Sequence, residues 1–184
     1  MNSNFEVITL NKKGITDFAK ERNLLLSKAK RAWVLFLDSD EELSGRILIS
    51  DGFNGYRLRR DNYFLGKFVG SDLIVRLARK DSGKWVRRVH EVWKVKGKIG
   101  TQKAYIIHNT ADNLTAYIEK INFYSDLHAR ANMEEGKSSN LFKIIFFPRL
   151  KFILTLFKSK NVIFSIMQSF HSFLSWTKLY FLRS

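Results

Sequence analysis

The sequence predicts an α/β protein with one compact domain and a helical tail. Three observations lead to this prediction. Residues 33–37 (WVLFL) form a continuous apolar run with the length of a strand that is buried on both faces. A segment with helical periodicity precedes this run, and several strand-like segments come after it, separated by glycines and by Asp or Asn clusters. After residue 136 the chain changes to amphipathic segments without acidic residues.

The first elements come in the order strand, helix, strand. Residues 5–10 (FEVITL) predict a short strand, which Gly14 separates from the next element. Residues 17–30 predict a helix capped by Thr16 or Asp17. Its buried face is expected to carry Phe18, Arg22, Leu25, Leu26 and Ala29, which fall on one side at helical spacing.

The rest of the domain predicts further strands and one longer helix. Strands are expected at residues 55–60, 73–79, 85–95 and 104–107. Residues 114–132 have apolar residues at helical spacing and predict a helix, and residues 133–140 form a polar link. We therefore expect a first domain over residues 1–136 and a tail over residues 137–184.

The tail carries an unusual charge pattern. The chain has a net charge of +15, and no acidic residue follows Glu135. The uncharged run 161–177 is too short and too polar for a membrane span, which needs roughly 20 mostly apolar residues. One helical stripe of this run is polar, with Ser165, Gln168, Ser169, Ser172 and Ser175. The opposite stripe is apolar, with Ile163, Ile166, Met167, Phe170, Phe173 and Leu174.

Two interpretations of this tail remain open at the level of sequence. The first is an amphipathic helical tail that lies in the interface of an anionic membrane. The second is a set of ordinary amphipathic helices that pack on the domain, since amphipathic periodicity is common to both cases. Nucleic acid is not expected as a partner, because no nucleic-acid-binding motif is present and bulky aliphatic residues separate the basic ones.

Composition excludes some other classes of site. The chain has no cysteine, so a disulfide framework, a Cys-ligated zinc site and a Cys nucleophile are excluded. Hydrophobic residues make up 45% of the chain and proline occurs once, which is typical of a folded protein with a core. Residues 1–11 have no basic start followed by an apolar core, so we expect no secretory signal there.

An acidic motif directly follows the apolar strand. Asp38 and Asp40 are two residues apart on the expected turn. In open α/β sheets, ligands bind beyond the carboxyl ends of the strands. Two such carboxylates can reach one divalent cation, and Mg²⁺ or Mn²⁺ accepts these oxygens together with substrate phosphates. The motif therefore predicts a divalent metal site, although an acidic cluster can also simply solvate a turn.

This part of the sequence resembles the family-two glycosyltransferases, most closely the subgroup that adds sugars to lipopolysaccharide core or similar glycolipids. The resemblance rests on DFAKERN at residues 17–23 and WVLFLDSDE at residues 33–41. It continues in order through GYR at 55–57, FLGK at 64–67, Arg76-Leu77, Val89-His90-Glu91 and Ile107-His108. It implies a GT-A type mixed sheet with flanking helices and C-terminal amphipathic helices. It also implies a nucleotide-sugar donor and inverting transfer to a membrane glycolipid or cell-envelope polysaccharide.

The sequence also departs from that family. Only about a dozen residues precede the Arg22-Asn23 helix, whereas one βαβ unit needs roughly 30 residues. We therefore expect the chain to be N-terminally truncated, without the strands that bind the nucleotide base. The segment between Gly66 and Arg76 is also shorter than usual, which affects the expected acceptor loop.

The resemblance implies roles for particular residues. Glu91 is the expected catalytic base, which takes the proton of the acceptor hydroxyl. Asp40 is the expected metal ligand, and Asp38 is expected to contact the metal or the ribose of the donor. His90 is expected to orient Glu91 or to contact a phosphate. A salt bridge between Glu91 and Arg87 or Arg88 is the alternative for this carboxylate.

Other polar residues are expected to surround the donor. Arg76 and Arg60 are suited to diphosphate or acceptor anions, because a guanidinium group offers bidentate donors. Arg22 and Asn23 are expected to brace the nucleotide site, and His108 to line it. A packing or solvated role is the alternative for each of these residues.

Three functional classes are consistent with these observations. The first is a glycosyltransferase that works as a peripheral protein on the cytoplasmic face of the cell membrane. The second is a non-catalytic, membrane-associated remnant that keeps the acceptor half of such an enzyme. The third, less favoured, is a basic nucleic-acid-binding protein.

Overall fold

The computed structural model describes residues 4–11 and 14–182, and within them it is a mixed α/β structure. The chain divides into two compact units. The sheet unit contains residues up to 62 together with 71–109, and the helical unit contains residues 63–70 together with 110 onward. The change of composition after residue 136 falls inside the helical unit, and the division into 1–136 and 137–184 stays a prediction.

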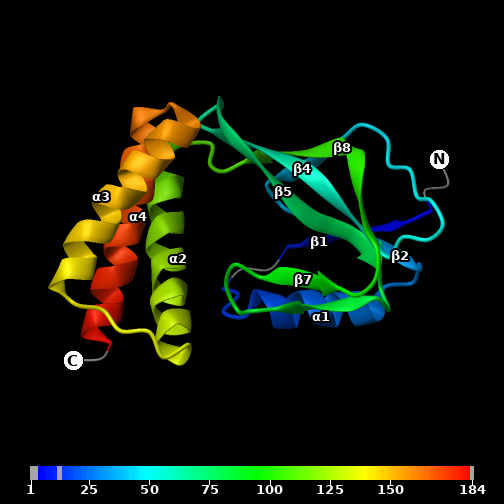
Figure 1. The fold of residues 1–184 in the computed structure, drawn as a ribbon, viewed down its shortest axis with the longest axis horizontal. Helices are drawn as coiled ribbons and strands as arrows, with labels where there is room; N and C mark the ends of the chain where they lie inside the picture. The colour runs from blue at the N-terminus through cyan, green and yellow to red at the C-terminus, as the bar shows by residue number, and fades with distance from the viewer. Residues whose placement is uncertain (1–3, 12–13, 183–184) are drawn as a thin grey trace. The chain divides into compact units, whose positions relative to one another are not determined.

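The main sheet has six strands in the order β1-β2-β5-β4-β8-β3 (Figure 1). Strand β2 (Trp33–Asp38) pairs in parallel with β1 (Glu6–Leu10) and antiparallel with β5 (Lys67–Arg79). The short strand β3 (Glu41–Ser44) pairs antiparallel with β8 (Ile99–Asn109). Strand β4 (Gly55–Phe64) lies between β5 and β8. The expected α/β class with a mixed sheet is therefore confirmed.

Strand β2 is buried on both faces, as its apolar run predicts. Val34 and Phe36 pack on one face with helix α1 (Phe18–Lys28) and with Trp85 and Trp93. The alternate residues Trp33, Leu35 and Leu37 pack on the other face with the cluster that also contains Tyr56, Leu58, Leu77 and Ile106. Because side chains alternate along a strand, Asp38 follows Phe36 toward the α1 face.

Helix α1 begins where the sequence predicts. Asp17 is its N-cap, and the Asp17 Oδ1 accepts a hydrogen bond from the backbone N–H of Lys20 at 2.9 Å. A cap of this kind satisfies one of the N–H groups that a helix leaves unpaired at its start. The helix buries Ala19, Arg22 and Leu26. It therefore brings a guanidinium group to the same face as Asp38.

The prediction of one strand over residues 85–95 is wrong. This segment contributes to two short strands, β6 (Gly83–Val86) and β7 (Val92–Val95), which pair antiparallel with Trp85 opposite Trp93. Between them, Arg87 and His90 adopt left-handed backbone conformations with φ of 73° and 54°. Such conformations are uncommon outside glycine and reverse the chain here. The two tryptophan rings stack at a centroid distance of 5.2 Å.

One strand was not predicted from the sequence, and three others were predicted too short. Strand β3 lies within the acidic cluster, where the charged residues obscure any strand pattern. Strands β4, β5 and β8 are each longer than the apolar segments at 55–60, 73–79 and 104–107 that predicted them. Polar residues in these strands include Arg60, Asn62 and Asp72, which belong to the candidate site.

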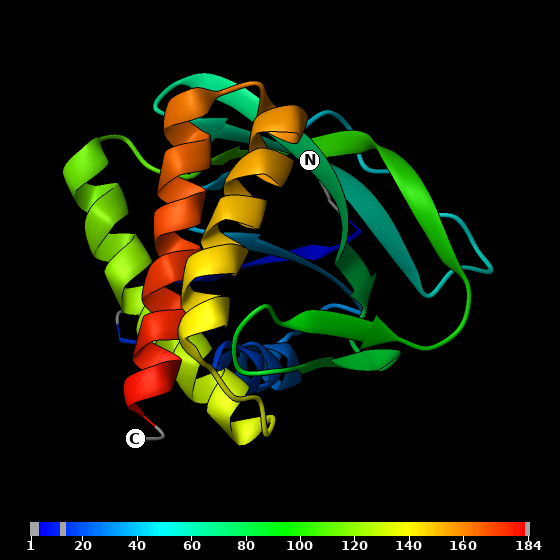
Figure 2. The same ribbon diagram turned by 60° about the vertical axis from the view of Figure 1, so that its left-hand side comes forward.

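The helical unit contains α2 (Leu114–Glu134), α3 (Leu141–Ser159) and α4 (Val162–Phe181). Each helix begins at an asparagine cap, Asn113, Asn140 or Asn161, whose side-chain oxygen accepts an N–H three residues later. Figures 1 and 2 both show α3 beside α4, which is consistent with the short connection between them. The core of the unit contains Phe64, Val69, Tyr117, Ile121 and Met167.

The buried Tyr117 predicts a loss of stability in alkali. Burial raises the pKa of Tyr117 to about 12, while Gln168, which donates a hydrogen bond to its hydroxyl at 2.8 Å, acts in the opposite direction. The folded state favours the neutral phenol, so its contribution is complete below about pH 10 and is lost as the pH rises toward 12. We expect unfolding of the parent protein to become about 3 kcal/mol easier over this interval. Tyr117→Phe should show a smaller alkaline decline, measured by urea unfolding at several pH values; equal declines would contradict the assignment.

Candidate functional site

Helix α1, strands β2 to β5 and the loop before β7 bring charged side chains together at the carboxyl end of β2. Arg22 of α1 is 1% exposed and contacts two carboxylates. Its Nε donates to Glu91 Oε1 at 3.0 Å, and its Nη2 donates to Asp38 Oδ1. The guanidinium carbon lies 4.7 Å from the centre of the Trp85 ring. Arg22 therefore joins Glu91 to Asp38 and packs against an aromatic ring.

The second oxygen of Asp38 contacts another arginine. Arg76 of β5 donates from Nη2 to Asp38 Oδ2 at 2.7 Å and to Glu41 Oε1 at 2.9 Å. The Glu41 side chain is fully buried and also accepts a hydrogen bond from Arg60 Nη1 at 3.1 Å. Its other oxygen accepts the backbone N–H of Asp38 at 3.0 Å. Glu41 thus fixes both the turn after β2 and two arginines.

The series of contacts ends at Asp72 of β5. Arg60 holds Asp72 through two hydrogen bonds, Nε to Oδ1 at 3.0 Å and Nη2 to Oδ2 at 2.7 Å. We call the connected residues the ion-pair chain. In order, they are Glu91, Arg22, Asp38, Arg76, Glu41, Arg60 and Asp72.

The ion pairs determine the charge state of this chain of residues. Burial alone would raise the pKa of Asp38, but Arg76 and Arg22 outweigh it and hold this pKa below its ordinary 3.8. Burial alone would lower the pKa of Arg60, but Asp72 and Glu41 outweigh it and raise this pKa above its ordinary value. Both groups therefore stay charged at neutral pH.

Asp40 is in a different environment from Asp38. Its side chain is 31% exposed, and its Oδ2 lies 3.4 Å from His108 Nε2. The other ring nitrogen, Nδ1, lies 2.7 Å from the Oδ1 of Asn62, which orients the ring. Within residues 4–11 and 14–182, no group of three acidic or histidine side chains is placed to hold a metal by itself. Asp40 and His108 would supply only part of a coordination shell.

The remaining predicted residues have structural contacts of their own. Asn23 donates from Nδ2 to the Trp85 carbonyl at 2.9 Å and accepts the Trp85 N–H at 2.9 Å, so it holds β6 against α1. His90 is exposed and has a left-handed backbone next to Glu91. Glu91 contacts Arg22, which the sequence did not indicate as its partner.

The sequence did not single out Glu41 and Asn62. Glu41 is the third acidic residue of the run 38–42, and only its burial distinguishes it from Glu42. Asn62 lies in the polar part of β4 that was not expected to be strand. Strand alternation is the signal that could have indicated Asn62 as a site residue. Asn62 is two residues after Arg60 and therefore points to the same face of the strand.

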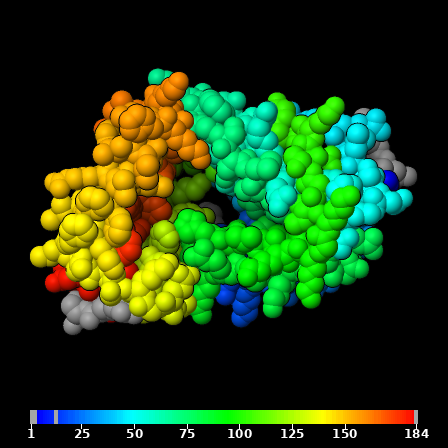
Figure 3. All heavy atoms as spheres, viewed as in Figure 1, coloured from blue at the N-terminus to red at the C-terminus, as the bar shows by residue number. Residues whose placement is uncertain are grey.

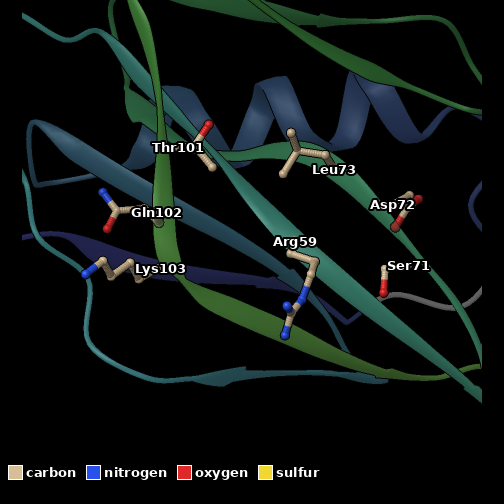
Figure 4. A pocket seen from close by; sticks show the side chains of 7 residues that line it. All are labelled: Arg59, Ser71, Asp72, Leu73, Thr101, Gln102 and Lys103. Carbon is tan, nitrogen blue, oxygen red and sulfur yellow. The ribbon is translucent and has the colours of Figure 1, made fainter.

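A groove lies on the sheet beside the end of the ion-pair chain. Its volume is about 570 Å³. Figure 4 shows side chains from β4, β5 and β8 around it. The lining residues are Arg59, Ser71, Asp72, Leu73, Thr101, Gln102 and Lys103. Asp72 is the one residue that belongs both to this lining and to the ion-pair chain.

Comparison with known proteins gives one informative similarity. No protein-family model matches the chain. The chain is similar to the lipopolysaccharide core biosynthesis glycosyltransferase LpsC of Rhizobium meliloti (strain 1021). The two sequences are 24% identical over an alignment of 186 residues. The alignment covers 89% of this chain and 69% of that protein.

Proposed function

We propose that this chain is a glycosyltransferase that moves a sugar from a nucleotide-sugar donor to a hydroxyl group of an acceptor. The main support is the position of Asp38 and Glu91, which the fold brings to one buried guanidinium group at the carboxyl end of β2. Ligands of open α/β sheets bind at this end of the strands. The similarity to a protein named as a glycosyltransferase supports the same reaction class.

Glu91 is our candidate for the catalytic base. In an inverting transfer, the acceptor oxygen bonds to the anomeric carbon while the bond from that carbon to the nucleotide diphosphate breaks. The proton of the acceptor hydroxyl passes to a carboxylate. Arg22 contacts Glu91 Oε1, so the second carboxylate oxygen is the one proposed to receive the proton. Through this contact, Arg22 holds the Glu91 carboxylate in position.

The donor side of the site is proposed to use the other predicted residues. Both oxygens of Asp38 already accept hydrogen bonds from arginines, so we propose that its remaining lone pairs accept from a ribose hydroxyl. Among the described residues, Arg22 Nη1 and Arg76 Nε are buried donors without a hydrogen-bond partner. We propose that these two unsatisfied N–H groups donate hydrogen bonds to the diphosphate oxygens of the donor. Asn23 supports the site through β6, and the exposed His90 is proposed to contact a phosphate.

A divalent cation, Mg²⁺ or Mn²⁺, is proposed to bind at Asp40 rather than at Asp38. Asp38 is a poor metal ligand because two guanidinium groups already neutralise its charge and repel a cation. Asp40 is partly exposed, and His108 lies beside it with its other ring nitrogen against the Asn62 oxygen, an orientation common for metal-bound histidines. When bound with the donor, the cation neutralises the charge that grows on the leaving diphosphate.

Metal binding tests this assignment without any activity measurement. We expect Mn²⁺ to bind the parent protein more tightly when a nucleoside diphosphate is present, because the phosphates complete the coordination shell. Asp40→Asn should weaken this binding at least about tenfold by isothermal titration calorimetry, since a coordinating carboxylate matters at least as much as the groups around it. Asp51→Asn, which changes an exposed turn carboxylate, is the matched control. Equal Mn²⁺ affinities for the two variants would show that Asp40 is not a metal ligand.

The reaction itself is tested by direct transfer. The purified chain is incubated with a panel of radiolabelled nucleotide-sugars and with membrane glycolipids or envelope polysaccharides as acceptors. We expect label to enter one acceptor class, with inverted anomeric configuration by NMR. A folded chain that binds no nucleotide-sugar and transfers none would instead support a non-catalytic relative of such enzymes.

A further inference from the structure

We propose that the helical unit docks on an anionic lipid bilayer through the outer faces of α3 and α4. The helices would lie in the membrane interface. No helix among the described residues is long and apolar enough to cross a membrane. The inference concerns a surface outside the sheet unit and does not depend on the sugar-transfer reaction. If both proposals hold, the acceptor is lipid-linked and the reaction takes place at a membrane surface.

Large apolar side chains are concentrated on the outside of these two helices. Phe157 is the extreme case, with 81% of its side chain exposed. Figure 3 shows the atoms of α3, in yellow to orange, at the surface of the helical unit. The exposed residues that we call the lipid face are Phe142, Ile145, Phe146, Leu150, Ile153, Leu154 and Phe157 of α3 and Val162, Ile163, Ile166, Phe170 and Phe173 of α4. Exposed apolar patches of this kind mark interaction sites.

The inner face of α4 carries serines beside its apolar residues Met167 and Leu179. Ser165 and Ser175 of α4 are buried. Their hydroxyls donate to backbone carbonyls one turn earlier, at Asn161 and His171, so burial leaves them satisfied. Ser169 donates to the carbonyl of Pro148 in α3 at 2.9 Å. These satisfied serines take up part of the inner face of α4, and many of its large apolar side chains are exposed on the outer face.

The charge of these helices selects the kind of lipid. No acidic residue lies in α3 or α4, and Arg149, Lys151, Lys158 and Lys160 are exposed. Lys178 contacts Asp126, Asn122 and Ser125, so it is not included among the basic residues available to lipid. Arg183 lies outside the described residues. Basic residues next to apolar side chains are the pattern of a helix on an anionic membrane surface.

Other occupants of the lipid face fit these observations less well. A second copy of the chain would bring the same basic residues against each other in a symmetric interface, which like charges oppose. A nucleic acid would match the charge, but its interfaces are strongly polar, whereas most residues of α3 and α4 that are exposed are apolar. An anionic bilayer matches both the charge and the apolar surface.

The test is co-sedimentation of the whole chain with vesicles of phosphatidylcholine, alone or mixed with phosphatidylglycerol. We expect tighter binding to the mixed vesicles, and partial loss of binding as salt rises, because salt screens the charges but not the apolar contacts. The triple variant Arg149→Gln, Lys151→Gln, Lys158→Gln should bind mixed vesicles about 100-fold more weakly. Phe157→Ser should bind both vesicle types about tenfold more weakly.

Each matched control makes the same change of net charge or of apolar content as its test variant, but at residues of the sheet unit. Lys84→Gln, Lys94→Gln, Lys96→Gln removes three exposed charges from the β6–β7 hairpin, and Leu48→Ser removes an exposed apolar residue of the sheet unit. Both should bind vesicles as the parent does. Equal losses in the test and control variants would overturn the proposal. Absence of vesicle binding, with either dimer formation or tight RNA or DNA binding that depends on Arg149, Lys151 and Lys158, would also overturn it.

Discussion

Asp38→Asn should lower the free energy of unfolding by about 3–5 kcal/mol, a large effect for a change that keeps the side-chain size. Asp38 is the shared partner of Arg22 and Arg76, and both arginines are almost fully buried. The neutral amide leaves two guanidinium groups close together without the negative charge between them. Arg22 keeps Glu91 and Arg76 keeps Glu41, so the two buried arginines have one counter-ion fewer rather than none, and the loss should fall at the lower end of this range.

The measurement is urea unfolding of Asp38→Asn beside Asp40→Asn. Asp40 is about as exposed as Asp38, 31% against 29%, but it pairs with His108 at 3.4 Å rather than with two buried arginines, so its loss should cost no more than about 1 kcal/mol. The comparison also has a pH signature. Because the pKa of Asp38 lies below 3.8 in the folded state, its contribution is complete above that pH and is lost as the pH falls further. The difference in free energy of unfolding between the parent and Asp38→Asn should therefore become smaller in acid. Equal stability of the two variants would show that Asp38 is not the counter-ion of this site.

Glu91→Gln should lower kcat by about 10²–10⁴ while the KM for the donor changes little, if the transfer reaction is established. The amide oxygen can still accept the hydrogen bond from Arg22 Nε, so the fold of the site is retained. The amide cannot take up the proton of the acceptor hydroxyl. The loss is therefore expected in the chemical step rather than in donor binding.

Steady-state kinetics and donor titration separate these two effects. Glu42→Gln is the matched control, because Glu42 is an exposed carboxylate next to the site. It should keep the parent rate. Full activity of Glu91→Gln, together with loss of activity in Asp72→Asn, would move the base to Asp72, which lines the groove on the sheet.

Local patterns in the sequence predicted the elements that carry the site. The apolar run 33–37 predicted a buried strand, and β2 is fully buried at Val34, Leu35 and Phe36. The position of Asp17 before an amphipathic segment predicted a helix cap, which the structure confirms. Such signals act over a few residues, through side-chain burial or through hydrogen bonds to nearby backbone groups. They could therefore be predicted without knowledge of the fold.

The failure at residues 85–95 has a different origin. Trp85 and Trp93 look like parts of one apolar strand, but the chain reverses between them and their rings stack. The reversal uses left-handed Arg87 and His90 rather than glycine, so no turn signal marks it. Packing of both tryptophans against Phe36 favours the hairpin over an extended strand. The position of Glu91 depends on this reversal.

The sequence by itself determined where the helices and central strand form, and that Asp38 and Asp40 follow that strand. Only the tertiary structure decided that Asp38 contacts two arginines while Asp40 contacts His108, since these partners come from separate elements. It also decided the orientation of α4, in which Ser165 and Ser175 face inward and Phe170 and Phe173 face outward. Periodicity shows which residues share a face of a helix, but the neighbouring elements determine which face is buried.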